Sequence, residues 1–262
     1  MTAALRLDVG YRVVHVWRRH MRVWLRYWIS NLITNFVEPF VYLIGLGFGI
    51  GHFVPRIGNV SYATFVAPGI IASSAMFAAS FESTFGTYVR LVYQKTFDAI
   101  IATPVSADEV SAGDLLYSAT KSTLFSAVIL VALVVTRLVP HPQAGSFLVP
   151  VVTALTGFVF GALGMIVSAL VPNIDNFNYY ITLFLTPMFV FAGVFYPVST
   201  LPAFARDIAW FTPLYHTVEL CRGLVLGGAS AGTLAGDFAW LLIAAVVLFP
   251  IPIVLMRKRL IQ

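Results

Sequence analysis

Long, uninterrupted apolar runs separated by short polar stretches are the main feature of this sequence. An α-helix rises 1.5 Å per residue, so crossing a hydrocarbon layer of about 30 Å takes roughly 20 residues. Continuous runs indicate helices, because the strands of a membrane barrel alternate apolar and polar positions over about ten residues. We therefore predict an all-α polytopic membrane protein with six spans, at residues 29–51, 62–88, 115–139, 147–170, 179–196 and 238–256.

The polar stretches divide this single transmembrane domain, residues 1–262, into parts. The two longest polar interruptions lie on opposite sides of the predicted membrane. Residues 89–114 are too many for a tight turn between helices, and residues 197–237 are too apolar for a plain loop. The predicted parts are an interfacial helix at 1–28, the six-span bundle at 29–256, a coupling loop at 89–114, an external re-entrant helical hairpin at 197–237, and a tail at 257–262.

The segment 11–27 is amphipathic. Trp17 and Trp24 share an apolar face, and a helix with this pattern lies in the headgroup layer, where cations meet anionic lipid. The segment could simply anchor the chain, or it could be a lever that passes motion from a cytoplasmic partner to the first span. The cations of its polar face recur at three- and four-residue steps, at Arg12, His15, Arg19, Arg22 and Arg26.

Composition excludes a soluble protein. Of the 262 residues, 59% are hydrophobic and only 10% are charged, whereas soluble domains average about 45–50% apolar and about 25% charged residues. Cys221 is the only cysteine, so an intrachain disulfide and sites built from several cysteines are excluded. The net charge of +5 fits a membrane surface better than nucleic acid, because of where the cations lie.

Lysine and arginine placement predicts the orientation. With six spans, both ends of the chain share one side, and that side holds twelve of the 16 cations. The other four are Arg56, Arg137, Arg206 and Arg222. The positive-inside rule then places both termini in the cytoplasm, as expected for a multi-pass protein of the inner (plasma) membrane.

Two polar regions carry local signals. Residues 94–104 form a short amphipathic pattern that Pro104 would end. Outside, Thr212 and Pro213 suit a helix N-cap and first turn, and Gly227 suits its stop. Three ionisable residues follow three-residue steps on that second external helix, as a self-neutralising surface stripe or as a polar exit gate: His216, Glu219 and Arg222.

Charges within the predicted spans are the remaining candidate sites, since each costs several kcal/mol in the membrane unless it is paired or hydrated. Glu38 lies about ten residues, roughly 15 Å, into the first span and precedes Pro39. It could mark the substrate path or the dimer seam, or it could cap a helix kink. Glu82 and Lys121 fall at similar depth on antiparallel spans, which favours a structural ion pair over a proton relay.

Sequence motifs for catalysis are missing. No G-x-x-x-x-G-K-[ST] phosphate loop, H-E-x-x-H motif or G-x-S-x-G elbow occurs, and the five histidines are scattered. We therefore predict no ATPase site, no metal and no cofactor in this chain. An ion-coupled transporter using Glu38 and Glu82 would predict paired broken helices in two halves, and no such repeat is visible. A membrane-embedded enzyme would need acid, base or metal-binding groups that converge on one face, and no such set is visible in the sequence.

The order of these parts resembles the type-2 ATP-binding-cassette exporter permeases over nearly the full chain. Four stretches narrow the resemblance further: Asn35-Phe36-Val37-Glu38-Pro39, Val60-Ser61-Tyr62 with Ser73-Ser74-Ala75-Met76, Thr156-Gly157 with Leu163-Gly164-Met165, and Pro213-Leu214-Tyr215-His216 with Glu219-Leu220. By the order and spacing of these stretches, the sequence is most similar to the nodulation protein J family of lipo-oligosaccharide exporters.

The resemblance implies a homodimer bound to two separate ATPase subunits, which would hold the ATP and magnesium. It implies export of an amphiphilic substrate, a lipo-oligosaccharide or lipid-linked polysaccharide; drug efflux is the alternative within the superfamily. Together with the missing phosphate loop, it predicts that a partner ATPase couples through the cytoplasmic loop, at Gln94, Lys95, Phe97, Asp98, Ile101, Thr103 and Pro104.

Overall fold

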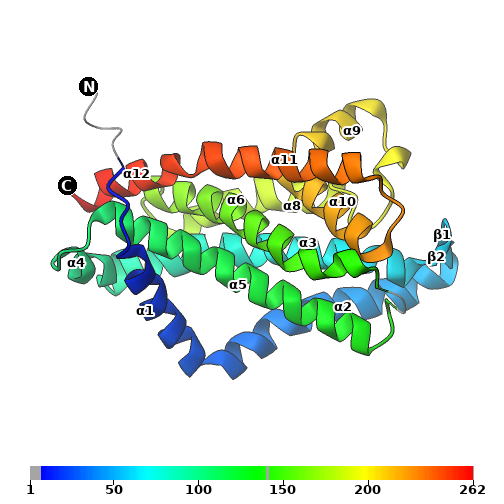
Figure 1. Ribbon diagram of the computed structural model, residues 1–262, viewed down its shortest axis with the longest axis horizontal. Coiled ribbons are helices and arrows are strands. Elements are labelled where there is room, and N and C mark those ends of the chain that lie inside the picture. The colour runs from blue at the N-terminus through cyan, green and yellow to red at the C-terminus, as the bar shows by residue number, and fades with distance from the viewer. Residues whose placement is uncertain (1–6, 140–141, 262) are drawn as a thin grey trace.

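The computed structural model describes residues 7–139 and 142–261. Residues 1–6 of the predicted interfacial segment, Arg6 among them, and residue 262 of the predicted tail lie outside the described residues. The molecule is an elongated bundle of helices (Figure 1). Helix α4, Thr96–Ile101, and the end of α12, Pro250–Leu260, lie at one end of the bundle, and the hairpin of β1, Arg56–Ile57, and β2, Val60–Ser61, lies at the other. We call these the α4 end and the hairpin end.

Four helical stretches among the described residues are long and apolar enough to cross a membrane. Tyr62–Tyr93 contains α3, Tyr62–Phe81, followed by two π-helical segments. Ala107–Val135 is α5. Ala144–Leu170 contains a 3₁₀ turn, Ala144–Leu148, and α6, Val149–Leu170; the last stretch, Ala231–Leu260, joins α11, Ala231–Leu248, to α12.

Two of the six predicted spans differ from these four. The first falls in α2, Trp28–Phe53, which is 26 residues long and whose apolar part is Val37–Phe53. The fifth, predicted at 179–196, is a helix that runs only over residues 177–191, through α7, Phe177–Tyr180, a π-helical segment, and α8, Thr186–Phe191. That helix is shorter than the roughly 20 residues that a straight crossing takes.

The predicted loop 89–114 is mostly helix. The π-helical segments Glu82–Gly86 and Val89–Tyr93 carry the α3 helix onward, and α5 already begins at Ala107. Ser106 and Glu109 start α5 with a reciprocal capping box. The predicted short helix is present as α4, between residues 95 and 102. The connecting segment is therefore about half as long as the sequence pattern predicted.

The two helices predicted in 197–237 are present as α9, Ala203–Trp210, and α10, Pro213–Leu226. The predicted caps of α10 are confirmed: the Thr212 hydroxyl accepts from the Tyr215 N–H, and Gly227 ends the helix at a φ of 79°. Helix α10 packs against α3, α6 and α11. A short 3₁₀ turn, Val198–Thr200, precedes α9.

Helix α1, Val13–Arg26, lies across α5 at an angle to the bundle (Figure 1). Gly113 permits this close approach, because a Cβ added there would fall 2.6 Å from the Val16 Cβ and 3.0 Å from the Val13 carbonyl oxygen. The main apolar core is built on α3, α6 and α10, and a second, smaller core lies beneath α4. The helix predicted at 11–27 is confirmed as α1, and the structure adds that this helix packs on α5.

Candidate functional site

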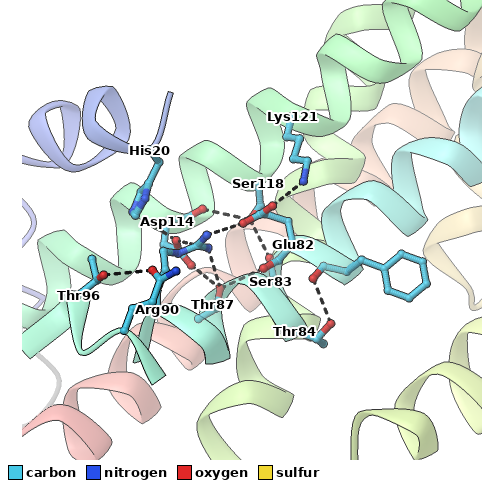
Figure 2. A network of polar contacts seen from close by, with 12 residues as sticks. His20, Glu82, Ser83, Thr84, Thr87, Arg90, Thr96, Asp114, Ser118 and Lys121 are labelled. Atoms are coloured by element: carbon cyan, nitrogen blue, oxygen red, sulfur yellow. Dashed lines mark hydrogen bonds and ion pairs between the residues drawn. The ribbon is translucent and has the colours of Figure 1, made fainter. Parts of the chain in front are cut away.

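Four charged side chains form a buried network between the α3 helix and α5 (Figure 2). Lys121 Nζ lies 2.6 Å from Glu82 Oε2, which confirms the ion pair predicted from the sequence. Arg90 joins both acids: its Nη1 is 2.6 Å from Glu82 Oε1 and its Nη2 is 2.7 Å from Asp114 Oδ1. Asp114 is fully buried and Glu82 is 7% exposed. Two acids and two bases cancel locally, so the cluster can persist in an apolar bundle.

The π-helical segments determine this geometry. A π turn holds one more residue than an α turn, which helps to bring Glu82 and Arg90, eight positions apart, to one side of the helix. Hydroxyl groups complete the cluster. Thr87 Oγ1 donates to Asp114 Oδ2 over 2.5 Å, and Ser83 Oγ donates to Ser118 Oγ over 2.8 Å.

Helix α1 reaches the network through His20, which is 3% exposed. Burial, reinforced by the positive charges of Arg90 and Arg19, lowers the pKa of His20 to about 3. The ring is therefore neutral at pH 7, and its Nε2, 3.5 Å from Asp114 Oδ1, makes a contact rather than an ion pair. Trp17 Nε1 also binds α1 to α5, donating to Thr120 Oγ1 over 3.0 Å.

A cavity of about 430 Å³ lies beside the network, between α1, the start of α2, the α3 helix and α5. Arg19 and Trp24 line it from α1, and Glu82, Arg90 and Lys121 line it from the network. Trp24 Nε1 and Arg90 Nε are buried, and neither has a hydrogen-bond partner in the part of the chain that the structure describes.

The predicted coupling residues in and around α4 differ in their exposure. Gln94, Lys95, Asp98, Thr103 and Pro104 are exposed at the end of the bundle, and Lys95 Nζ lies 3.8 Å from Asp98 Oδ2. Ile101 is half-buried.

Phe97 departs from the expectation of a partner-facing residue. It is fully buried in the small core, with Leu115 of α5 and Met256 of α12. Phe97 therefore fixes α4 to the spans, and the exposed residues around it form the accessible surface.

The segment after α4 is bonded to the chain that leads into α1. Arg12 Nη1 donates to the Pro104 carbonyl oxygen over 2.5 Å, and Ser106 Oγ donates to the Asp8 carbonyl oxygen over 2.8 Å. Asp108 accepts from the Asp8 N–H and lies 2.8 Å from Arg257 Nε. These contacts connect the segment after α4 with the chain before α1 and with α12.

Glu38 and Pro39 lie on α2, away from the network. Both line a groove of about 190 Å³ whose other walls carry Phe77, Phe81 and Phe189. The Glu38 carboxylate is exposed, and no hydrogen bond or ion pair to it occurs among the described residues. The structure thus separates Glu38 from Glu82 and Lys121, which the sequence grouped with it as intramembrane candidates.

The prediction of one surface stripe at His216, Glu219 and Arg222 is wrong. His216 is 2% exposed; its Nδ1 is 2.7 Å from Asp237 Oδ1 of α11 and its Nε2 is 2.7 Å from the Trp210 carbonyl oxygen. Arg222 binds Glu219 at 2.6 Å, donates to the Gly193 carbonyl oxygen over 2.7 Å, and lies 4.1 Å from the Phe65 ring centroid. Six positions advance an α-helix by about 600°, which leaves His216 and Arg222 roughly 120° apart around its axis, so the two side chains face different neighbours.

Four residues of these contacts were not predicted from the sequence: Arg90, Asp114, His20 and Asp237. The first two were assigned to a loop because charges end a hydropathy run, although Asp114 lies seven positions before Lys121, two helical turns along α5. No group of three or more His, Cys, Asp or Glu side chains that could hold a metal occurs within residues 7–139 and 142–261.

A family model described as ABC-2 type transporter matches residues 11–226. Nodulation protein J of Rhizobium leguminosarum bv. viciae is 36% identical over 254 residues, 97% of this chain and 96% of that protein. Nodulation protein J of Rhizobium leguminosarum bv. trifolii is 37% identical over 251 residues, 95% of this chain and 94% of that protein. The inner membrane transport permease YadH of Escherichia coli strain K12 is 23% identical over 209 residues, 80% of this chain and 79% of that protein.

Proposed function

The chain belongs to the ABC-2 type transporter family as a membrane permease subunit, and on this basis we propose that it exports an amphiphilic saccharide with energy from a separate ATPase. The chain would act as a homodimer bound to two ATPase subunits. Those subunits would hold ATP and magnesium, because the sequence of this chain contains no phosphate loop.

The observation that carries the energy-coupling proposal is the arrangement at the α4 end. The residues around Asp98 form an exposed polar surface, and the buried side chain of Phe97 holds α4 against the spans. The hydrogen bond from Arg12 to Pro104 connects that surface with α1. Motion of an ATPase against α4 would then reach α1, which contacts the charge network through His20, and so shift the spans.

Charge reversal on the α4 surface tests this proposal. Asp98→Arg should abolish copurification of the ATPase subunit, or its stimulation by the permease, while the permease still inserts and folds. Asp175→Arg is the matched control, because Asp175 is an exposed acid in the α6–α7 connection. Export by the chain with no ATPase partner, or full coupling in Asp98→Arg, would refute the proposal.

A lipo-oligosaccharide or lipid-linked polysaccharide is the substrate that we propose. Similarity to proteins named nodulation protein J, at 36–37% identity over nearly the whole chain, favours a saccharide over a drug. The groove at Glu38 suits an amphiphile, because aromatic rings accept apolar chains and sugar faces while a carboxylate accepts hydroxyl groups.

Transport into inverted vesicles that contain the permease and its ATPase separates the substrate classes. An N-acylated oligosaccharide should be taken up with ATP, whereas the same oligosaccharide without its acyl chain should not. Uptake of a cationic amphiphilic drug in preference to the acylated oligosaccharide would assign drug efflux instead.

We further propose six spans, with both chain ends in the cytoplasm and the 197–237 segment re-entering from outside. The fully buried Cys221 and the exposed Gln143 suit a labelling test in intact cells. A membrane-impermeant thiol reagent should label Gln143→Cys in a Cys221→Ser background quickly and native Cys221 slowly. Asp175→Cys in the same background should react only after the membrane is opened. Rapid labelling at position 175 in intact cells would invert the orientation.

A further inference from the structure

Two arginines face one groove at the hairpin end, and no acid faces them within residues 7–139 and 142–261. The groove has a volume of about 520 Å³ and lies between the β-hairpin, the start of α3, the residues that directly follow α5, Gln143 and the end of α10. Val60, Val139 and Leu226 supply its apolar wall. Its polar lining consists of Arg56, Asn59, Ser61, Thr64, Arg137 and Gln143.

The charge on this lining is uncompensated. Arg56 donates to the Asn59 carbonyl oxygen over 3.3 Å, and the Arg137 guanidinium has no hydrogen-bond or ion-pair partner among the described residues. No aspartate or glutamate belongs to the part of the lining that the structure describes, whereas Arg222, at the same end of the bundle, binds Glu219. Two like charges at one groove repel each other, and a bound anion would offset this repulsion by attracting both guanidinium groups.

The backbone at Arg137 supports a binding role. Its φ of 58° is in the left-handed region, directly after α5, at the position where glycine is the usual residue. A bulky side chain is strained there, so a guanidinium at this position is not explained by helix termination. Strained residues of this kind cluster at ligand sites.

We propose that this groove binds an acidic group, a phosphate, sulfate or carboxylate, carried by a hydroxylated molecule on the outer side of the membrane. Guanidinium groups bind such anions with paired, charge-assisted hydrogen bonds. The amides of Asn59 and Gln143 are partners for hydroxyl groups. The Ser61 and Thr64 hydroxyls bond each other at 2.8 Å, and Thr64 Oγ1 donates to the Leu138 carbonyl oxygen, so these two oxygens can still accept but not donate. The outer location rests on the proposed orientation, and the carrier is either an exported saccharide or a lipid headgroup of the outer leaflet.

Binding to the full chain in phosphatidylcholine nanodiscs tests the inference without requiring transport. A sulfated disaccharide should bind, and the same disaccharide without sulfate should bind at least tenfold more weakly. Raising the salt concentration should weaken binding of the sulfated ligand, as screening requires. Equal binding of the two disaccharides would overturn the proposal.

Arg137→Gly is the decisive variant. Glycine relieves the strained backbone, so thermal stability should stay the same or rise, while affinity for the sulfated disaccharide should fall about tenfold. Arg56→Gln should weaken binding by a similar factor. Arg206→Gln is the matched control, because Arg206 is an exposed arginine on α9 outside the groove. Equal weakening by Arg206→Gln, or unchanged binding in Arg137→Gly, would overturn the proposal.

Nanodiscs containing phosphatidylglycerol identify the carrier. If the sulfated disaccharide binds in phosphatidylcholine discs but not in phosphatidylglycerol discs, the anionic lipid headgroup occupies the site. If the disaccharide binds in both kinds of disc, the site is assigned to a saccharide. Both results support an anion site. If the chain binds the anion but exports without any ATPase, this inference stands and the proposed function is refuted. If the chain shows ATP-driven export but binds no anion, the proposed function stands and this inference is refuted.

Discussion

The charge network near the α4 end and the His216–Asp237 pair near the hairpin end both stabilise buried ionisable side chains, but with different sets of partners. Both place ionisable side chains inside a bundle with little exposed area. In the network, Arg90 is shared between Glu82 and Asp114, and Glu82 is shared between Arg90 and Lys121. In the pair, one histidine contacts one carboxylate and one carbonyl oxygen.

The difference determines which substitutions each region tolerates. A carbonyl oxygen can only accept, so His216 must donate from Nε2, and one proton must lie between Nδ1 and Asp237 Oδ1. A neutral imidazole can satisfy both contacts if position 237 supplies that proton. In the network no single neutral residue can replace Glu82, because two cations would lose a partner together.

The largest effect is expected in the network. Glu82→Gln leaves Lys121 without a counter-charge and Arg90 with only Asp114, and should lower the free energy of unfolding by about 4 kcal/mol. Thermal unfolding and the yield of folded protein in detergent measure this loss. Glu82→Gln combined with Lys121→Gln should lose less than the sum of the single variants, and additive losses would show that the two side chains do not interact.

Substitutions in the His216–Asp237 pair should lower the free energy of unfolding by less than Glu82→Gln does, and the loss should differ between the two partners. His216→Leu leaves the Asp237 carboxylate and the Trp210 carbonyl without their donor and should cost about 3 kcal/mol. Asp237→Asn should cost only about 1 kcal/mol, because the amide can donate to Nδ1 while Nε2 still donates to the carbonyl oxygen. Equal losses in the two variants would contradict this proton arrangement.

Acid should detach α1 from the network. The pKa of His20 is about 3 in the folded chain, whereas an ordinary histidine side chain in water has a pKa of about 6.5. The unfolded or undocked state therefore binds more protons than the docked state between those two values. Docking is fully stable above about pH 6.5 and should weaken by on the order of 2 kcal/mol at pH 5.

Thiol labelling of Val16→Cys in a Cys221→Ser background reports this detachment, because Val16 is 3% exposed in the docked helix. Labelling should be slow at pH 7.5 and fast at pH 5. His20→Gln keeps a neutral side chain at both values and should remove the pH dependence. Labelling that accelerates equally in the His20→Gln variant would place the acid response elsewhere.

The smallest effect is expected at Glu219. Its carboxylate is 35% exposed and pairs with Arg222 within one turn of α10, so solvent screens the pair. Glu219→Gln should change the free energy of unfolding by less than about 1 kcal/mol, because Arg222 keeps its bond to the Gly193 carbonyl oxygen and its contact with Phe65. A loss as large as that of Glu82→Gln would remove the distinction between the two regions.

The helices and many of their ends follow from the sequence alone. Apolar runs specify membrane helices because backbone groups must be satisfied within each segment. Thr212, Pro213 and Gly227 mark the limits of α10 through local hydrogen bonding and backbone geometry. The pairing of Glu82 with Lys121 was also predictable, since antiparallel helices bring residues of equal depth together.

The positions of the other charges depend on the tertiary structure. Hydropathy counts the cost of each charge alone, so Arg90 and Asp114 were assigned to a loop; in the fold they lie in helices, because each cancels the charge of a neighbour on another helix. His216 was placed on the surface for the same reason, since its partner, Asp237, comes from a later helix. The Arg90–Asp114 and His216–Asp237 contacts join different helices, so hydropathy and helical periodicity, which describe one segment at a time, do not reveal them.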